Sequence, residues 1–282
     1  MFSHVWSIRI NLKPLRFELK WIPFLIFSIA GNITVIFLLQ FGYHDSGKAF
    51  VIIRYFGVAL SIPFLYLCLN EIFYLLKSLR SRVFKFIRWC DIISSVLGII
   101  IGSMGFIFEN WIFYDFLAGF ICVGSIKLFH FKSLKEAYTS MIITFLAITV
   151  LTIILHFLLT LSYNDYAGEL SSPLFLQVPD LVENLFKKCS WLPILDVIIP
   201  GVTLSYLRLH DENKSSKCGG IYTVTGNLTF VIATIIWILL EYVYPYSVPF
   251  SLVTYPLLML SIFIVAWRRL DWPTLYEGKF HQ

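Results

Sequence analysis

Long apolar segments separated by short polar connections constrain this chain more than any other feature of its sequence. A segment of about 17–25 mostly apolar residues is long enough to cross a bilayer as a helix. Eight such segments can be counted, at about residues 21–41, 52–76, 92–108, 111–129, 141–162, 192–208, 221–244 and 249–267. The sequence therefore predicts an all-α, polytopic membrane protein with about eight transmembrane helices.

Composition supports this class and excludes others. The chain is 58% hydrophobic and 14% charged, whereas soluble domains average about 25% charged residues. The longest connection, about 163–190, is too short for a soluble domain. We expect a single membrane-embedded domain over 1–282 within the lipid bilayer. The net charge of +5 does not indicate nucleic-acid binding, because the basic residues lie in short loops.

The distribution of Lys and Arg predicts the orientation. With eight spans, the basic residues fall on one side, in the N-terminal segment, in the loops 77–91 and 130–140, between 208 and 217, and after the last span. The positive-inside rule then places both termini in the cytosol. Lys187 and Lys188 are exceptions, in a loop assigned to the other side. The first segment is too long for the core of a cleavable signal peptide.

No metal or cofactor site is predicted. The five cysteines show neither metal-ligand spacing nor a disulfide framework and are expected to pack as small apolar residues. His156, alone in an apolar segment, is expected to hydrogen-bond to a neighbouring helix rather than to bind a metal. We therefore expect no metal ion and no cofactor.

Asp196 is the main candidate for a functional residue. It lies near the middle of the apolar run from Trp191 to Gly201. An aspartate near the centre of a span costs about 2.5–3.5 kcal/mol on insertion scales. Such residues usually serve a function, although a structural hydrogen bond from a neutral acid to a neighbouring helix is an equally open reading.

Five motifs follow one another from residue 110 to the C-terminus. They are Asn110-Trp111 with Asp115 and Cys122, Lys132-Ser-Leu-Lys135, Val178-Pro-Asp-Leu181, Asp196-Val-Ile-Ile-Pro200-Gly201 and Leu275-Tyr-Glu277. In this order they resemble the signal peptide peptidase and presenilin-like intramembrane aspartyl proteases, and the signal peptide peptidase branch most. The resemblance separates N-terminal spans, 1–109, from a protease-like core, 110–282.

That resemblance implies a biochemical setting. The family members are hydrolases of the endoplasmic reticulum membrane that cut transmembrane helices such as signal peptides. It implies that Asp196 is one catalytic aspartate and that the transmembrane helices of client or partner proteins are the ligands. It also implies that this chain has one span fewer than is usual in the family, missing on the N-terminal side.

The departures from the family pattern predict impaired catalysis. The position of the second catalytic aspartate falls on Ile148, and no acidic residue occurs in 141–162. Pro193 and Leu195 stand where the family has glycines. The family's Pro-Ala-Leu motif, a substrate-binding segment of the last helix, reads Pro249-Phe250-Ser251, and the Phe250 ring is expected to crowd the cleft.

Aspartyl proteolysis needs two carboxyl groups that share one proton. The ionised group takes a proton from water, while the protonated group polarises the scissile carbonyl. A single buried carboxyl in an apolar site stays mostly neutral, so it can donate a hydrogen bond but cannot also activate water. We therefore predict a pseudo-protease that binds transmembrane helices without cutting them.

Two other functions stay open at this point. Asp115 lies at a similar depth to Asp196, about four residues from the external end of its segment, and could replace the second acid in an active aspartic endopeptidase. Alternatively, Asp196, Asp115 and Lys127 could line the polar path of a transporter or channel.

Overall fold

The structure is a computed structural model of the chain. It describes residues 46–81, 83, 87–108, 110–159, 173, 175–179, 189–213, 220–243 and 249–278. The first predicted segment, 21–41, therefore lies outside the described residues, as does the loop that holds Lys187 and Lys188.

Each of the other seven predicted segments coincides with one described helix. These are α2 (Ser46–Leu75), α3 (Trp89–Ile107), α4 (Trp111–Leu128), α5 (Leu134–Leu159), α7 (Ile194–Asn213), α8 (Ile221–Val243) and α9 (Phe250–Arg268). A 3₁₀ helix η2 (Lys77–Arg80) and a short helix α10 (Trp272–Glu277) complete the helices of the described part. The all-α, polytopic membrane fold is confirmed.

Five of these helices are long and apolar enough to cross a membrane. They are α2 over Arg54–Leu75, α3, α4, α8 over Ile221–Leu240, and α9. Helix α7 is more polar, because charged residues from Arg208 onward fill its last turns. In α5 the side chains are described only up to Leu146.

Helix α5 begins earlier than the sequence predicts. Residues 134–140 were expected in a connection, but they form the first two turns of α5. Ser133 caps this end, because its Oγ accepts a hydrogen bond from Glu136 N at 3.2 Å. Glu136 Oε2 in turn accepts from Lys132 N at 2.8 Å. This reciprocal capping satisfies free amide groups and starts the helix at Leu134.

A β-hairpin lies within the region predicted as a connection. Strands β1 (Phe175–Pro179) and β2 (Cys189–Pro193) pair antiparallel, with Phe175 opposite Pro193. The predicted span 192–208 is therefore wrong at its start, because Leu192 and Pro193 belong to β2 and α7 begins at Ile194. Backbone pairing with β1 overrides the apolar run as a helix signal.

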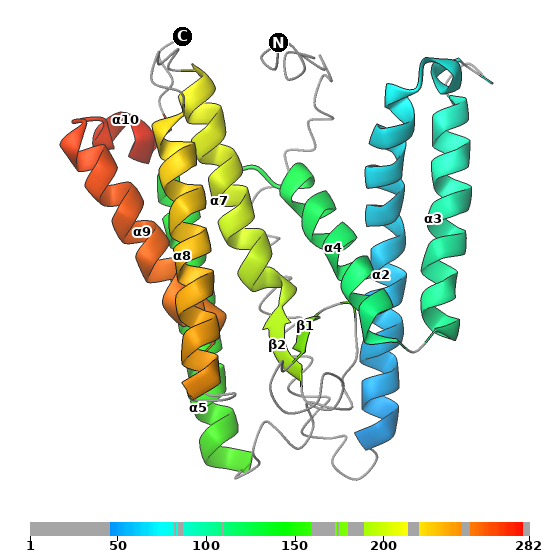
Figure 1. The fold of residues 1–282 in the computed structure, drawn as a ribbon, viewed down its shortest axis with the longest axis horizontal. Coiled ribbons are helices and arrows are strands. Elements are labelled where there is room, and N and C mark those ends of the chain that lie inside the picture. The colour runs from blue at the N-terminus through cyan, green and yellow to red at the C-terminus, as the bar shows by residue number, and fades with distance from the viewer. Residues whose placement is uncertain are drawn as a thin grey trace.

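Successive helices run in alternating directions, so the connections gather at two ends of the bundle (Figure 1). One end, which we call the basic end, carries Arg88, Lys132, Arg208, Arg268 and Arg269. The opposite end, which we call the hairpin end, carries β1, β2 and the start of α9. Asp196, two residues into α7's first turn, lies near the hairpin end.

Helix α4 connects two packed clusters. One cluster lies between α2 and α4 around Val58, Leu65, Tyr114 and Leu117. The larger cluster joins α4, α5, α7, α8, α9 and α10. Gly201 of α7 faces Ile126 of α4 so closely that a Cβ at residue 201 would collide with the Ile126 side chain. Glycine at 201 therefore allows the close packing of α4 on α7.

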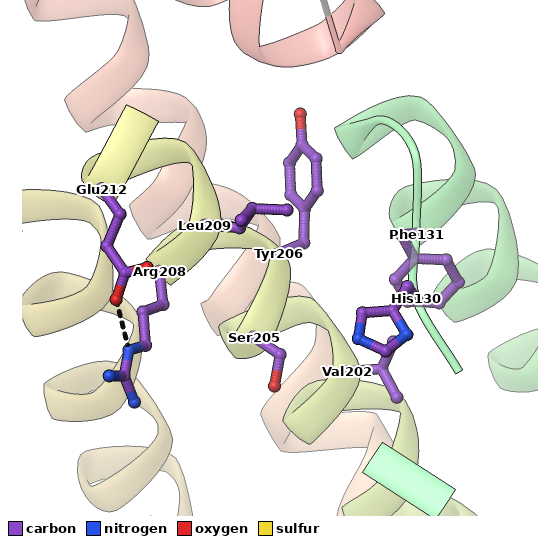
Figure 2. A pocket seen from close by; sticks show the side chains of 8 residues that line it. All are labelled: His130, Phe131, Val202, Ser205, Tyr206, Arg208, Leu209 and Glu212. Atoms are coloured by element: carbon purple, nitrogen blue, oxygen red, sulfur yellow. Dashed lines mark hydrogen bonds and ion pairs between the residues drawn. The ribbon is translucent and has the colours of Figure 1, made fainter. Parts of the chain in front are cut away.

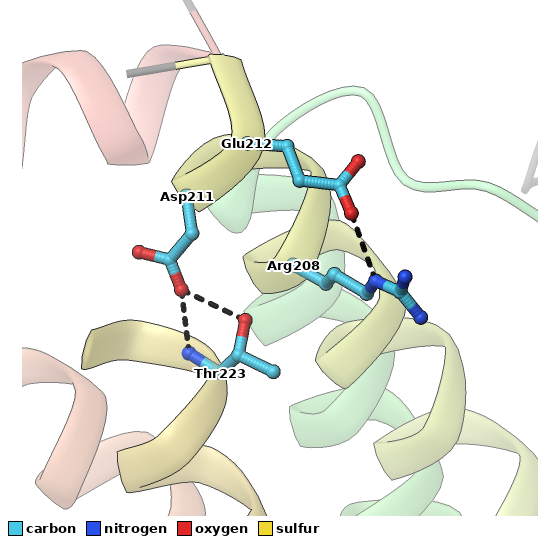
Figure 3. Close-up of polar contacts among 4 residues, drawn as sticks. All are labelled: Arg208, Asp211, Glu212 and Thr223. Carbon is cyan, nitrogen blue, oxygen red and sulfur yellow. Dashed lines mark hydrogen bonds and ion pairs between the residues drawn. The ribbon is translucent and has the colours of Figure 1, made fainter. Parts of the chain in front are cut away.

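Asp211 ties the end of α7 to the start of α8 (Figure 3). Its Oδ2 accepts hydrogen bonds from Thr223 N at 2.7 Å and from Thr223 Oγ1 at 2.8 Å. Its Oδ1 accepts from Tyr222 N at 3.4 Å. Free amide groups at a helix N-terminus need such acceptors, so Asp211 acts as a cap for α8 supplied by the preceding helix.

Candidate functional site

Asp196 is buried at the point where the hairpin passes into α7. Only 1% of its surface is exposed, and it follows Pro193, the last residue of β2, by three positions. Pro200 lies one turn further along α7. Because proline has no amide hydrogen, the Asp196 backbone carbonyl lacks its usual helical partner. The local sequence thus concentrates polar backbone and side-chain groups around this residue.

The partners of the Asp196 carboxyl come from α9. The Tyr255 hydroxyl donates to Asp196 Oδ1 at 3.5 Å, and Tyr255 is itself 1% exposed. Ser251, one turn before Tyr255 on the same face of α9, lies beside the carboxyl. Among the described residues, the buried Ser251 hydroxyl has no hydrogen-bond partner at ordinary distance and angle. The carboxyl therefore accepts one long hydrogen bond from Tyr255 and lies beside both the backbone amide and the hydroxyl group of Ser251.

An aromatic cluster fills the space next to these groups. Phe250 is 3% exposed and packs edge-on against Trp237, with ring centroids 5.3 Å apart, and against Phe230 at 5.9 Å. Leu192 of β2 belongs to the same cluster, which also packs against Val197. The residues predicted to bind substrate are thus brought close to Asp196, but Phe250 is packed into the core.

Pro249 sets where this arrangement begins. It is the residue directly before α9, with extended backbone angles. Inside a helix, proline costs one backbone hydrogen bond because it has no amide hydrogen. At a helix start that hydrogen bond is not made, so proline is favourable there. This position places Ser251 and Tyr255, four residues apart, on one face of α9.

Helix α5, which the resemblance predicts to provide the second carboxyl, has no carboxylate near Asp196. Ile148 lies within α5, and its side chain is outside the described residues. Glu136 is the single carboxylate in the sequence of α5, and it lies in the first turn, at the basic end. Asp196 lies near the hairpin end, so Glu136 cannot pair with it.

Asp115 lies in a different part of the structure. It lines a groove of about 490 Å³ between α2 and α4, together with Gly119, Phe120, Glu71 and Lys127. Glu71 and Lys127 form an ion pair there. The residues that line this groove come from α2 and α4, whereas the Asp196 carboxyl contacts α9. The structure therefore does not bring Asp115 and Asp196 into one site.

A smaller cavity of about 160 Å³ lies at the basic end (Figure 2). His130 and Phe131, from the α4–α5 connection, face Val202 and Ser205 of α7 across it. Arg208 Nε and Glu212 Oε1 form an exposed ion pair at 2.9 Å on its rim. This cavity involves the last turns of α7 and not Asp196.

A model of the signal peptide peptidase family matches residues 15–282. The chain belongs to the signal peptide peptidase family. The match starts well before Asn110, so family membership also covers most of the N-terminal spans, where the sequence motifs gave no signal. Family and helices together make the chain a multi-pass membrane protein.

Two curated proteins are similar to this family member. Human (Homo sapiens) signal peptide peptidase-like 2A is 22% identical over 185 residues, which are 61% of this chain and 35% of that protein. The mouse (Mus musculus) protein of the same name is 23% identical over 255 residues, which are 83% of this chain and 48% of that protein. The chain therefore spans less than half the length of either relative. No solved structure matches it.

Sequence reasoning identified only part of this site. Asp196, Phe250 and Ser251 were predicted as site residues, and the structure brings them together. Tyr255, the hydrogen-bond donor to Asp196, was missed. Its spacing of four residues from Ser251 on a helix was the available signal, because residues four apart share a helix face.

Proposed function

We propose that this member of the signal peptide peptidase family binds transmembrane helices of client or partner proteins without cutting them. The observation that carries the proposal is the single carboxyl group. Asp196 is buried against Tyr255 and Ser251 of α9, while α5 has Ile148 where the family pattern has an aspartate. A lone neutral acid cannot both activate water and polarise a carbonyl.

The expected loss of activity is large. Removing an essential member of a catalytic unit usually costs several orders of magnitude in rate. We expect no cleavage above background from the natural sequence, with Asp196 and Phe250 marking the remains of the former active site. Retained packing of α4, α5, α7 and α9 supports a scaffold that still recognises helices, as expected for a family whose substrates are transmembrane segments.

Placement of Asp115 supports this proposal over an active protease with a substituted acid. It lines the groove between α2 and α4 that also holds the Glu71–Lys127 ion pair. Its carboxyl would have to reach the α7–α9 contact to share a proton with Asp196. The same separation argues against one continuous polar path through both aspartates.

We further propose that the protein resides in the endoplasmic reticulum membrane with both termini in the cytosol. The observation that supports the orientation is the gathering of Arg88, Lys132, Arg208, Arg268 and Arg269 at one end of the bundle. Epitope tags at each terminus, tested for antibody access after selective permeabilisation of the plasma membrane, would check this. Access only after the organelle membrane is opened would contradict it.

The first experiment is cleavage of a membrane-spanning signal-peptide reporter by the purified full chain in bilayers, beside Asp196→Ala. We expect no cleavage by either protein and co-purification of the uncut reporter with both. Cleavage that is lost in Asp196→Ala would refute the proposal and require a second acid, for which Asp115→Asn is the next variant. A reporter that neither is cut nor co-purifies would refute the helix-binding function.

A further inference from the structure

Two independent features separate the Asp196 site from that of an active aspartyl protease, and only the first is the missing carboxylate at residue 148. The second is the packing of α9 on the start of α7. Tyr255 and Ser251 contact the carboxyl, and the ring of Phe250, the residue before Ser251, packs in the cluster that contacts Val197, the residue after Asp196. All three residues are at most 3% exposed.

A peptide bound for hydrolysis needs both the hydrogen-bonding position at the Asp196 carboxyl and the apolar space beside it. Its carbonyl group must hydrogen-bond to the carboxyl, and its side chains must lie in the space beside the carboxyl. In this structure the Tyr255 hydroxyl is at 3.5 Å from Asp196 Oδ1. Phe250 packs edge-on against Trp237 and Phe230 and so is held by two aromatic contacts. Each aromatic pair of this kind stabilises the fold by about 0.5–1.5 kcal/mol in addition to the gain from burying its apolar surface.

We infer that α9 closes the Asp196 site by itself: Tyr255 occupies the hydrogen-bonding position at the carboxyl, and Phe250 fills the space that a substrate backbone would enter. Tyr255 is therefore a positioning residue that fixes the carboxyl to α9. The inference rests on the proposed function and extends it, because restoring a carboxylate at residue 148 would not be enough to restore proteolysis.

The test begins from Ile148→Asp in the full chain, in bilayers, with the same signal-peptide reporter. Ile148→Asp alone is expected to stay at the background of the natural sequence. The triple variant Ile148→Asp, Tyr255→Val, Phe250→Ala is expected to cut the reporter at least about tenfold faster than Ile148→Asp alone. Adding Asp196→Asn to the triple variant should abolish this cleavage. Ile148→Asp with Leu252→Ala is the matched control, because Leu252 adjoins Ser251 on α9 but is 43% exposed.

The outcomes separate the inference from the proposed function. If Ile148→Asp alone cuts as fast as the combined variant, the inference is wrong while the proposed function stands. A combined variant that folds but remains silent also overturns the inference, because then other groups block the site. Cleavage by the natural sequence would refute the proposed function and the closure together.

A second measurement does not require the combined variant to fold. The C=O stretching band of the Asp196 carboxyl, identified in infrared spectra by its loss in Asp196→Asn, reports its hydrogen bonding. We expect Tyr255→Phe to shift this band to higher frequency. Tyr138→Phe should not move it, although it also removes an interhelical bond to α9, from Tyr138 Oη to the Met259 carbonyl at 2.7 Å. An unshifted band in Tyr255→Phe would overturn the inference.

Discussion

Helix α7 carries a buried aspartate near each end, and the two are stabilised in opposite ways. Asp211, at the basic end, accepts three hydrogen bonds at 2.7–3.4 Å from the start of α8. Asp196, at the hairpin end, accepts one hydrogen bond of 3.5 Å from Tyr255, lies beside Ser251, and is next to the aromatic cluster around Phe250. A carboxyl with several close donors is a structural cap, whereas a buried carboxyl with fewer close donors in an apolar setting is a candidate functional group.

Polar contacts at the basic end extend beyond Asp211. The Tyr222 hydroxyl donates to Asp271 Oδ2 at 3.0 Å, and Arg269 Nε lies 3.4 Å from the same oxygen. The His210 ring packs edge-on against Tyr222, with centroids 5.4 Å apart. The side chain of Asp211 is thus held mainly by hydrogen bonds, whereas that of Asp196 lies next to packed aromatic rings, and the two positions should respond differently to substitution.

Phe250→Ala should have the largest effect, because it removes a ring from the packed cluster at the hairpin end. Large-to-small changes of a buried phenylalanine cost about 3–5 kcal/mol. Unfolding in mixed micelles with increasing denaturing detergent would measure the loss. Leu252→Ala, two residues further along α9 at an exposed position, should cost far less, and equal losses for the two variants would contradict a packed hairpin end.

Asp211→Ala should be the next largest, at about 2–3 kcal/mol. It leaves the Thr223 amide and hydroxyl without their charged acceptor, and hydrogen bonds to charged groups contribute about 1.5–3 kcal/mol. Hydrogen exchange at the first amides of α8 should rise together with the loss of stability. Unchanged exchange at Thr223 would show that Asp211 is not the cap of α8.

Asp196→Asn should change stability by less than about 1 kcal/mol, because an amide can replace a neutral acid as a partner of one hydroxyl. Asp211→Asn should lose more, since an amide has one acceptor oxygen and no charge, whereas both oxygens of the Asp211 carboxylate accept hydrogen bonds from the start of α8. Measuring both in the same detergent series tests the comparison directly. Equal losses at the two positions would remove the distinction between the two aspartates.

Glu212→Ala should have the smallest effect, within about 0.5 kcal/mol. Glu212 pairs with Arg208 one turn earlier, but their side chains are 60% and 67% exposed. Exposed pairs of this kind contribute about 0.3–0.5 kcal/mol. A loss as large as that of Asp211→Ala, its sequence neighbour, would mean that the basic end is stabilised by surface charge and not by the buried cap.

The boundaries of elements were harder to predict than their number. Apolar runs gave seven of the described helices because a helix that crosses lipid must be long and apolar throughout. They could not give the start of α5, which depends on capping by Ser133 and Glu136. They also could not give β2, because pairing between residues 175–179 and 189–193 is a non-local contact that no local pattern encodes.

By itself, the sequence determined the membrane class and the alternating topology. It also singled out Asp196 as a polar residue in an apolar run and showed that residue 148 is isoleucine and not an acid. These follow from composition, run length and residue identity, which do not depend on packing. Only the tertiary structure decided which groups face Asp196. Tyr255 and Phe250 lie more than fifty residues away in the chain, and the crossing of α9 over the start of α7 places them there, through contacts between elements that are distant in sequence.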